Sequence, residues 1–327
     1  MRILRRLFQG QAYSPLGSAF RESLATIAKR VGVDEDTVRH RLKRFQESGF
    51  LPDWRLYVNP RIWAGGQVSL WADVDATVPK RPLVEELRTI PGVIAVHTFY
   101  DGLAAFVEYD EEWILPETIR RIRDVAGGSD AFVARTAFPA GPIPLSERDW
   151  ALIRAIRENP WRPYADIAAE VGLSVRTTRA RLTRIFELGA LFAWPAINFR
   201  ALEGGVFVHL VTWYALERKA ELDEAVAGLL ESGLWHTLHL LPYRPGDLCP
   251  CTYHLRFPNV PEAQAALARV LRVPGVERAR LYLNEDVFTF FDAYATRLDR
   301  MLMRTPAATP AVLTRGRPNR ARAPEPG

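Results

Sequence analysis

The sequence of 327 residues predicts an α+β fold built from two tandem copies of one module. Residues 25–54 align without a gap to residues 165–194, and 14 of these 30 positions are identical. In each copy this stretch has the apolar period of helices, and the residues after it alternate between strand-like and helix-like patterns. The chain is therefore expected to be a duplication of a helical part followed by a mixed part.

Composition limits the class of protein. Apolar residues make up 48% and charged residues 25% of the chain, as in ordinary globular proteins, and the length suggests two or more domains. No apolar run approaches the roughly 18 residues that cross a bilayer. The two cysteines, Cys249 and Cys251, exclude a framework of disulfides. We expect a cytoplasmic protein without a membrane partner.

The net charge of +5 comes largely from the C-terminal segment. Residues 304–327 contain five arginines and one acid, and the rest of the chain then has 38 basic and 37 acidic residues. Because this segment is rich in proline and poor in large apolar residues, we expect a disordered tail. Its arginines suit a non-specific arm for phosphate, and a solvated extension is the simpler interpretation.

The helical part of each copy contains two short helices. Ile27, Ala28 and Val31 form one buried stripe, and Gly32 ends that helix. Asp34 in the first copy and Ser174 in the second are suitable N-caps for the next helix. The inward faces of these second helices are predicted to be Val38, Leu42 and Phe45, and Thr178, Leu182 and Ile185. Short extended wings are predicted at residues 51–59 and 191–199.

The mixed part of each copy is predicted to follow the order strand, helix, strand, strand, helix, strand. In the first copy the strands are residues 68–74, 93–99, 103–109 and 132–137, with helices at 82–90 and 115–125. In the second copy the strands are residues 206–214, 234–241, 248–257 and 277–283, with helices at 220–231 and 261–270. This βαββαβ order is that of ferredoxin-like domains.

The whole pattern resembles the leucine-responsive/AsnC (Lrp-like) family of transcription regulators. Residues 24–49 and 165–189 resemble its winged helix-turn-helix, and each mixed part resembles its effector-binding and dimerisation domain. The resemblance implies a winged helix-turn-helix at residues 1–62 and 146–203, and a ferredoxin-like domain at residues 63–138 and 204–303. The proline-rich linker is residues 139–145, and the tail is residues 304–327. In an ordinary member two sheets pack face to face across a two-fold axis; here the two copies would do so within one chain.

A recognition helix needs hydrogen-bonding side chains along one stripe and cations beside it for phosphates. The candidate DNA-binding residues are Thr37, Arg39, His40, Arg41 and Arg44 in the first copy, and Arg176, Thr177, Arg179, Arg181 and Arg184 in the second. Acids at positions 34–36 repel phosphates, so the second copy is expected to bind DNA more firmly. The alternative is an ordinary solvated basic face. Unlike helices would prefer unlike half-sites.

An effector site is also implied by the resemblance. The family has a glycine and an aspartate at the turn between the second and third strands of the mixed domain. Gly246 and Asp247 resemble that pattern, and Asp101 and Gly102 carry it in reversed order. The implied effector is an amino acid or a similar small molecule. The alternative is plain turn chemistry, since aspartate and glycine are common in hairpin loops.

A metal site is considered because three histidines and two cysteines gather in one hairpin of the second copy. With a turn at residues 244–247 and Tyr243 opposite Leu248, His236 shares a face with Cys249 and Cys251. His239 and His254 then lie on the other face, so the five side chains do not surround one ion. We therefore expect no metal, although a slipped register or a bulge would change this conclusion.

One enzyme class is an alternative. The siroheme decarboxylases also resemble paired Lrp-like modules, and the resemblance implies histidines and arginines that contact carboxylates; His236, His239, Tyr243 and Arg244 are the candidates. Ordinary half-buried sheet residues are the simpler interpretation. No glycine-rich phosphate loop or nucleophile elbow is present in the sequence. The expected function is a DNA-binding transcription regulator that self-associates, with no enzymatic activity, no catalytic residues and no cofactor.

Overall fold

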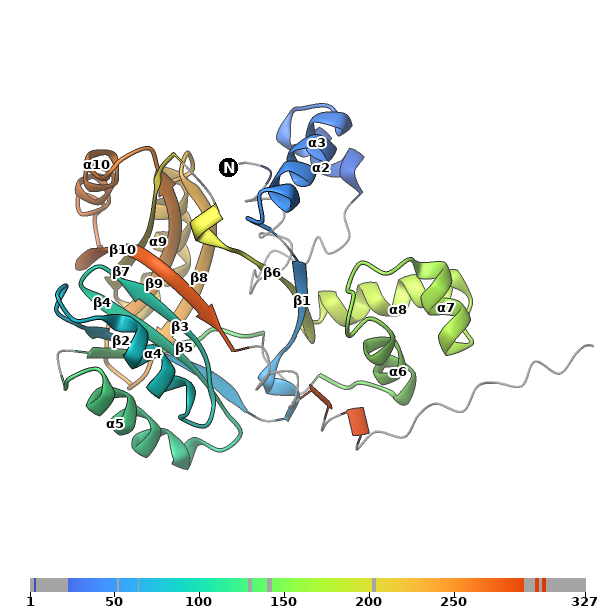
Figure 1. Cartoon of the computed structure of the whole chain (residues 1–327), viewed down its shortest axis with the longest axis horizontal. Coiled ribbons are helices and arrows are strands. Elements are labelled where there is room, and N and C mark those ends of the chain that lie inside the picture. Colours follow the sequence, from blue (N-terminus) through green and yellow to red (C-terminus); the bar gives the residue numbers. More distant parts are fainter. Residues whose placement is uncertain are drawn as a thin grey trace, which may run out of the picture.

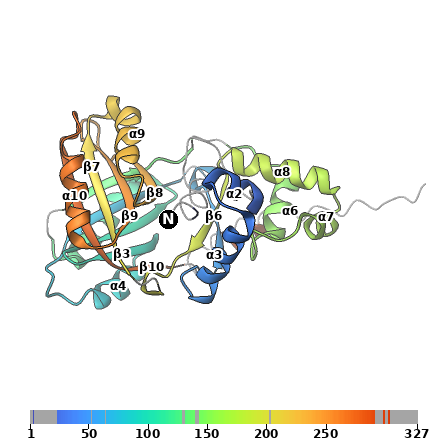
Figure 2. The same cartoon turned by 90° about the horizontal axis from the view of Figure 1, so that it is seen from above.

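The computed structural model describes residues 3, 23–51, 53–63, 65–128, 131–139, 143–201, 204–290, 298–299 and 302–303. The predicted tail at residues 304–327 and residues 140–142 of the predicted linker at 139–145 lie outside the described residues. A strand-rich body lies at one side of the molecule and two helical units lie at the other (Figures 1 and 2). Among the described helices, none is long and apolar enough to cross a membrane.

The first helical unit contains α2 (Leu24–Val31) and α3 (Glu35–Glu47), which are the two helices predicted there. Asp34 caps α3, because its side chain accepts a hydrogen bond from the Thr37 backbone N–H at 2.6 Å. Gly32 ends α2 with a φ of 73°, a left-handed backbone conformation that residues with a Cβ atom rarely adopt. Val38 is fully buried on the inward face of α3.

The second helical unit contains α6 (Glu147–Ala155), α7 (Tyr164–Val171) and α8 (Val175–Glu187). Ser174 caps α8 and accepts from the Thr177 backbone N–H at 3.1 Å, so the predicted cap is confirmed. The predicted inward residues Thr178, Leu182 and Ile185 are fully buried. The same local chemistry therefore forms a helix-turn-helix in both halves.

Short wings follow the helical units and pair with each other. β1 (Asp53–Val58) lies antiparallel to β6 (Leu191–Ala196), with Leu56 opposite Ala193. A hydrogen-bonded chain then joins β1 to the strand-rich body: Gln67 donates to the Tyr57 hydroxyl at 2.9 Å, and that hydroxyl donates to buried Glu108. The wings thus fix the helical units to the rest of the molecule.

The mixed parts contain the predicted strands and helices with small shifts at their ends. The strands are β2 (Gly66–Asp73), β3 (Val93–Phe99), β4 (Gly102–Tyr109), β5 (Ala131–Thr136), β7 (Val206–Tyr214), β8 (Leu234–Pro242), β9 (Cys249–Phe257) and β10 (Arg278–Thr289). The helices are α4 (Lys80–Arg88), α5 (Leu115–Val125), α9 (Lys219–Leu229) and α10 (Val260–Val270). The fold is of the mixed α+β class.

The eight strands form one closed barrel, in the order β10-β3-β4-β2-β5-β8-β9-β7. Two separate sheets packed face to face were expected, and this expectation is corrected. β10 pairs with β7 through residues 278–283 and continues to pair with β3 through residues 284–289. β5 pairs with β8 at the other junction. The predicted strand ended at residue 283. Residues 284–289 extend β10 because they pair with β3 of the other half, and this pairing was not predictable from local sequence.

Three apolar cores follow from this closure. Helices α4 and α5 cover the outside of the first half, and α9 and α10 cover the outside of the second (Figure 1). The third core lies inside the barrel and joins side chains of both halves, including Trp71 and Phe99 with Val211, Trp213 and Tyr282. Each strand therefore has an inner and an outer face, and both faces are largely buried.

Candidate functional site

Four of the six histidines in the chain meet inside the barrel. His97 comes from β3, His209 from β7, His236 from β8 and His254 from β9. The ring centroids of His209 and His254 are 4.2 Å apart, those of His236 and His254 are 4.9 Å apart, and those of His97 and His209 are 5.3 Å apart. We call these four side chains the inner histidine cluster.

Strand register brings the inner histidine cluster together. His209 lies directly opposite His254 on β9, and His254 lies opposite His236 on β8. A bulge between Leu234 and His236 shifts the pairing of β8 with β9. Since opposite residues on paired strands project to the same face, the three histidines of the second half share the inner face. His97 joins them because β10 holds β3 against β7.

Burial controls the charge of the cluster. Burial lowers the pKa values of His97 and His236 to about 3, and with help from neighbouring histidines it holds those of His209 and His254 well below 6.5. Among the described residues, no group hydrogen-bonds to either ring nitrogen of His209 or to Nε2 of His254. Leaving such a buried polar group without a partner costs about 1–3 kcal/mol. The cluster is thus a set of neutral bases kept at an energetic cost.

Aromatic rings surround the cluster. The Trp71 and Phe99 rings stack with centroids 5.4 Å apart, and the Tyr282 ring lies 5.0 Å from Phe99. The His209 ring meets the edge of Phe99 at 5.0 Å. This environment combines flat apolar surfaces with several imidazole nitrogens. Imidazole N–H groups can donate hydrogen bonds there, and the aromatic faces offer apolar contact.

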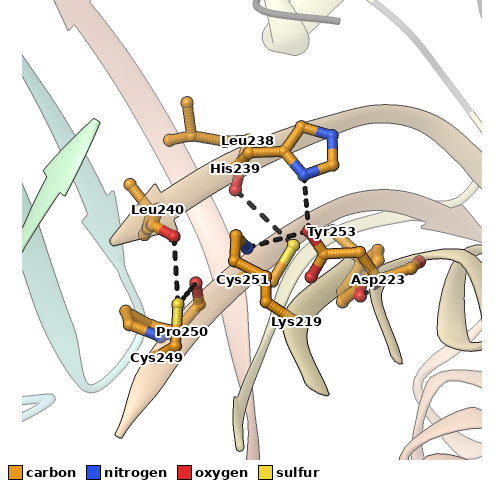
Figure 3. A network of polar contacts seen from close by, with 9 residues as sticks. All are labelled: Lys219, Asp223, Leu238, His239, Leu240, Cys249, Pro250, Cys251 and Tyr253. Atoms are coloured by element: carbon orange, nitrogen blue, oxygen red, sulfur yellow. Dashed lines mark hydrogen bonds and ion pairs between the residues drawn. The ribbon is translucent and has the colours of Figure 1, made fainter. Parts of the chain in front are cut away.

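A second polar group lies on the outer face of the same hairpin, beneath α9 (Figure 3). His239 Nδ1 donates to Asp223 Oδ2 at 2.6 Å, and Lys219 Nζ donates to the same oxygen at 2.8 Å. Cys251 lies opposite His239 on β9 and is fully buried. The side-chain ligand atoms of Asp223, His239 and Cys251 all lie within 4.8 Å of one another. We call these three residues the outer trio.

The face assignment predicted for this hairpin is wrong. We expected His236 to share a face with Cys249 and Cys251, but His239 does so. The expected register placed His236 opposite Leu255, but His236 lies opposite His254 and His239 lies opposite Cys251, so the strands pair one residue away from it. When the register shifts by one residue, each side chain of one strand shares a face with the other set of alternate side chains on its partner strand.

The pKa values differ sharply between the two faces. Burial lowers the pKa of His239, but hydrogen bonds with Asp223 and Cys251 and the nearby negative charges outweigh it and raise the pKa to about 9. Burial raises the pKa of Cys249 to about 11 and also raises that of Cys251. His239 is therefore a cation at neutral pH, whereas both thiols are protonated in the absence of a bound metal ion.

The predicted DNA-binding residues of α3 lie on its outward side. Thr37 donates its hydroxyl to Asp34 at 2.8 Å, and Arg39 pairs with Glu35. One shallow surface hollow is lined by Asp34, Asp36, Thr37, His40, Arg41 and Arg44. Arg41 and Arg44 are exposed and form no ion pair with any residue that the structure describes. Two predicted cations of α3 are thus available to an anionic partner.

Some of the corresponding basic side chains of α8 contact an acidic residue of α6. Arg181 donates to Asp149 at 2.9 Å, and Arg184 lies 3.8 Å from the same carboxylate. Burial raises the pKa of Asp149, but bonds from Ser146 and Arg181 outweigh it and hold the pKa below its ordinary value. The remaining predicted residues are Thr177 in the first turn and the exposed Arg176 and Arg179. The fixed carboxylate therefore neutralises part of this basic face.

The predicted effector residues do not come together with the inner histidine cluster. Asp101 accepts a hydrogen bond from Arg280 of β10 at 3.0 Å, which ties the β3–β4 turn to the other half. A Cβ at Gly102 would lie 2.7 Å from the carbonyl oxygen of Ala72, so close strand packing explains this glycine. Gly246 and Asp247 lie in the exposed turn between β8 and β9. Their role in effector binding stays a prediction.

The sequence analysis named neither His97 nor His209 as a site residue, and it placed His254 on the face opposite His236. The usable signal was that all four histidines of the cluster lie in predicted strands. Alternation within a strand could not bring them together, because their meeting depends on the register at four strand contacts. Of the candidate residues for carboxylates, only His236 reaches the cluster; Tyr243 and Arg244 lie at the hairpin turn.

Comparison with known proteins adds two findings. Residues 145–185 match the AsnC-type helix-turn-helix domain. An uncharacterized HTH-type transcriptional regulator of Pyrococcus horikoshii is 27% identical over 113 residues, which are 33% of this chain and 75% of that protein. A similar regulator of Pyrococcus abyssi is 26% identical over 113 residues, with the same coverage. The regulators thus match one part of the chain.

The chain as a whole has the fold of a solved enzyme. The siroheme decarboxylase NirDL, in complex with an iron-uroporphyrin III analogue, gives a TM-score of 0.50 at 16% identity. The match covers 93% of this chain and 99% of that chain. This finding corrects the expectation that the protein has no enzymatic activity, since the fold of an enzyme spans both halves. Residues 145–185 are thus similar to the AsnC-type helix-turn-helix domain, and about a third of the chain is similar to transcriptional regulators of the HTH type.

Proposed function

We propose that this protein is an enzyme that decarboxylates a planar, carboxylate-bearing tetrapyrrole. The inner histidine cluster carries this proposal, because both ring nitrogens of His209 and Nε2 of His254 are buried without a hydrogen-bond partner among the described residues. Buried polar groups without partners are uncommon in folded proteins, and functional sites are where they are retained. The full-length likeness in fold to a siroheme decarboxylase supports the choice of substrate class.

The electrostatics of the cluster suit this reaction. In the ligand-free chain burial keeps the pKa values of the histidines low. A substrate carboxylate brought within hydrogen-bond distance favours the charged form of an imidazole, so substrate binding raises the pKa and draws in a proton. In this proposal the flat ring system packs against the aromatic rings of Trp71, Phe99 and Tyr282, which lie in the core inside the barrel. The cluster thus becomes charged only when a substrate is present.

The reaction then balances with one proton. The bond between the carboxylate carbon and its side-chain carbon breaks, carbon dioxide leaves, and the electron pair stays on the side-chain carbon. An imidazolium of the cluster donates its proton to that carbon and returns to the neutral form. His209 and His254, whose rings are the closest pair, are the proposed donors. The two helix-turn-helix units hold the wings and support the barrel.

The test is a binding and turnover assay with iron-uroporphyrin III and siroheme. The expected results are a change in the porphyrin absorption spectrum on binding and release of carbon dioxide with one substrate. His209→Gln and His254→Gln should lose turnover by about 100-fold or more. His40→Gln, on exposed α3, serves as the control and should keep it. Absence of both binding and carbon dioxide release in the wild type would refute the proposal.

A second candidate function is DNA binding through α3. The specific observation is that Arg41 and Arg44 are exposed without a described ion pair, whereas Arg181 and Arg184 face Asp149. In this proposal α3 binds DNA more firmly than α8. The sequence analysis expected the opposite order, because of the acids at the start of α3. In this proposal the paired wings set the spacing of the two helical units, and the fused halves bind unlike half-sites.

Pull-down of sheared genomic DNA followed by a salt titration tests this candidate. Arg41→Ala with Arg44→Ala should lower the slope of log affinity against log salt by about 2, one for each lost phosphate contact. Arg181→Ala with Arg184→Ala should lower it by less. Asp149→Ala removes the competing carboxylate and should strengthen DNA binding. Equal slopes in the wild type and in both double variants would rule out these helices as the DNA interface.

A further inference from the structure

We propose that the outer trio of Asp223, His239 and Cys251 binds one divalent transition-metal ion of the zinc class. The site lies between the outer face of the β8–β9 hairpin and α9, which carries Lys219 and Asp223 (Figure 3). The inner histidine cluster lies on the other face of the hairpin. The proposal does not depend on either function proposed above. It reverses the expectation from the sequence, which rested on a register that the structure does not have.

The donor set fits such an ion. One carboxylate, one imidazole and one thiol supply oxygen, nitrogen and sulfur, which are the ligand types of zinc sites. Their ligand atoms already lie within 4.8 Å of one another. Around a tetrahedral zinc ion with bonds of about 2.0–2.3 Å, ligand atoms lie roughly 3.5 Å apart. Rotation of side chains is thus enough to close the site.

An independent observation is the second oxygen of the carboxylate. Asp223 is largely buried, with 8% of its side chain exposed. Its Oδ2 receives both His239 and Lys219, but its Oδ1 is buried without a hydrogen-bond partner among the described residues. Figure 3 shows the side chains of Asp223, His239, Cys251 and Lys219 converging on one point. The carboxylate therefore keeps a second, unsatisfied oxygen that a bound cation can engage.

Lys219 occupies the place of a cation in the metal-free chain. Its ammonium lies 2.8 Å from Asp223 and belongs to a flexible side chain at the start of α9. The exposed fractions are 14% for Lys219 and 23% for His239, so the site opens to solvent on this side. When the metal ion enters, the ammonium moves outward, the thiol and the imidazolium release protons, and the thiolate and carboxylate neutralise the two positive charges.

Cobalt(II) is the probe for the test, because it replaces zinc and is coloured. We expect the full-length chain, freed of metal by a chelator, to bind one equivalent of Co²⁺ with a thiolate charge-transfer absorption. Zn²⁺ should then displace it. Cys251→Ser should lose this absorption, and Cys249→Ser should keep it, because Cys249 is not among the residues whose ligand atoms lie within 4.8 Å of one another. The Lys219→Met variant should bind Co²⁺ about tenfold more tightly than the wild type, since the competing ammonium group is removed.

His239→Gln is a second variant, in case Cys251→Ser does not fold. Its side chain is partly exposed, and we expect a folded chain with at least tenfold weaker Co²⁺ binding. A folded wild type without thiolate charge transfer would overturn the proposal, as would an absorption that survives Cys251→Ser. A cobalt spectrum without a thiolate contribution would place the ion at histidines alone, which also overturns it.

Discussion

The two faces of the β8–β9 hairpin hold the same kind of side chain in opposite states. On the inner face burial lowers the pKa of His236 to about 3, and that of His254 lies well below 6.5. On the outer face, three residues along the same strand, the pKa of His239 is about 9. All three rings are largely buried, so burial alone does not set the charge. The difference comes from Asp223, a carboxylate that the inner face lacks among its described neighbours.

The comparison indicates how one hairpin supports two kinds of chemistry. The inner histidines are neutral, and an anionic ligand would be needed to stabilise their charged form. The outer histidine already has its negative partner and is held as a cation beside a buried thiol. A ligand for the inner face should therefore be an anion, and a ligand for the outer face should be a cation. Three experiments test this contrast.

The largest expected effect is a loss of stability in acid. The four inner histidines have folded-state pKa values below the ordinary value of 6.5. The unfolded chain therefore binds more protons below about pH 6.5, and the free energy of unfolding falls as the pH falls through that window. At pH 5 His97 and His236 each contribute a loss of about 2 kcal/mol relative to pH 7, and His209 and His254 add losses of the same sign. Urea unfolding at both pH values measures the total.

Two variants separate the cluster from the rest of the chain in that experiment. His209→Gln removes one of the four titrating groups and should reduce the acid-induced loss by about a quarter. His40→Gln removes an exposed histidine and should leave the loss unchanged. Equal stability of the wild type at pH 7 and pH 5 would show that the inner rings are not buried as neutral bases.

A smaller effect is expected from breaking the outer face. Asp223→Asn removes the charge that compensates both Lys219 and His239, and these groups are only 14% and 23% exposed. Removing one partner of a buried ion pair costs about 3 kcal/mol. The midpoint of urea unfolding measures the loss. Asp247→Asn, in the exposed hairpin turn, is the matched control and should cost less than about 1 kcal/mol. Similar losses in the two variants would contradict the contrast.

The smallest effect is expected from Lys219→Met. His239 still compensates Asp223 in this variant, and the methionine side chain keeps most of the apolar packing of the lysine stem. We expect a loss of about 1 kcal/mol in the free energy of unfolding. Thermal unfolding of the metal-free protein measures it. A loss as large as that of Asp223→Asn would mean that Lys219, not His239, is the main partner of the carboxylate.

Local features of the fold were predictable from the sequence. The caps at Asp34 and Ser174 and the stop at Gly32 depend on residues within a few positions of each other, so the pattern alone locates α3 and α8. The strands of the mixed parts were found by the same means, as were the candidate cations of both helices. Their engagement was not predictable, because Asp149 reaches Arg181 from another helix.

The sequence by itself determined the repeat, the two helix-turn-helix units and the alternation of helices and strands, since short-range spacing and capping encode them. Only the tertiary structure decided which histidines meet. Closure of the barrel through β10 and β5 brings His97 to His209, and a shift of one residue between β8 and β9 exchanges His236 for His239 beside Cys251. The physical reason is the two-residue period of a strand. Alternation along the chain tells which residues of one strand share a face, but which residues of the neighbouring strand join them depends on the register, and the register is set by packing far away in the sequence.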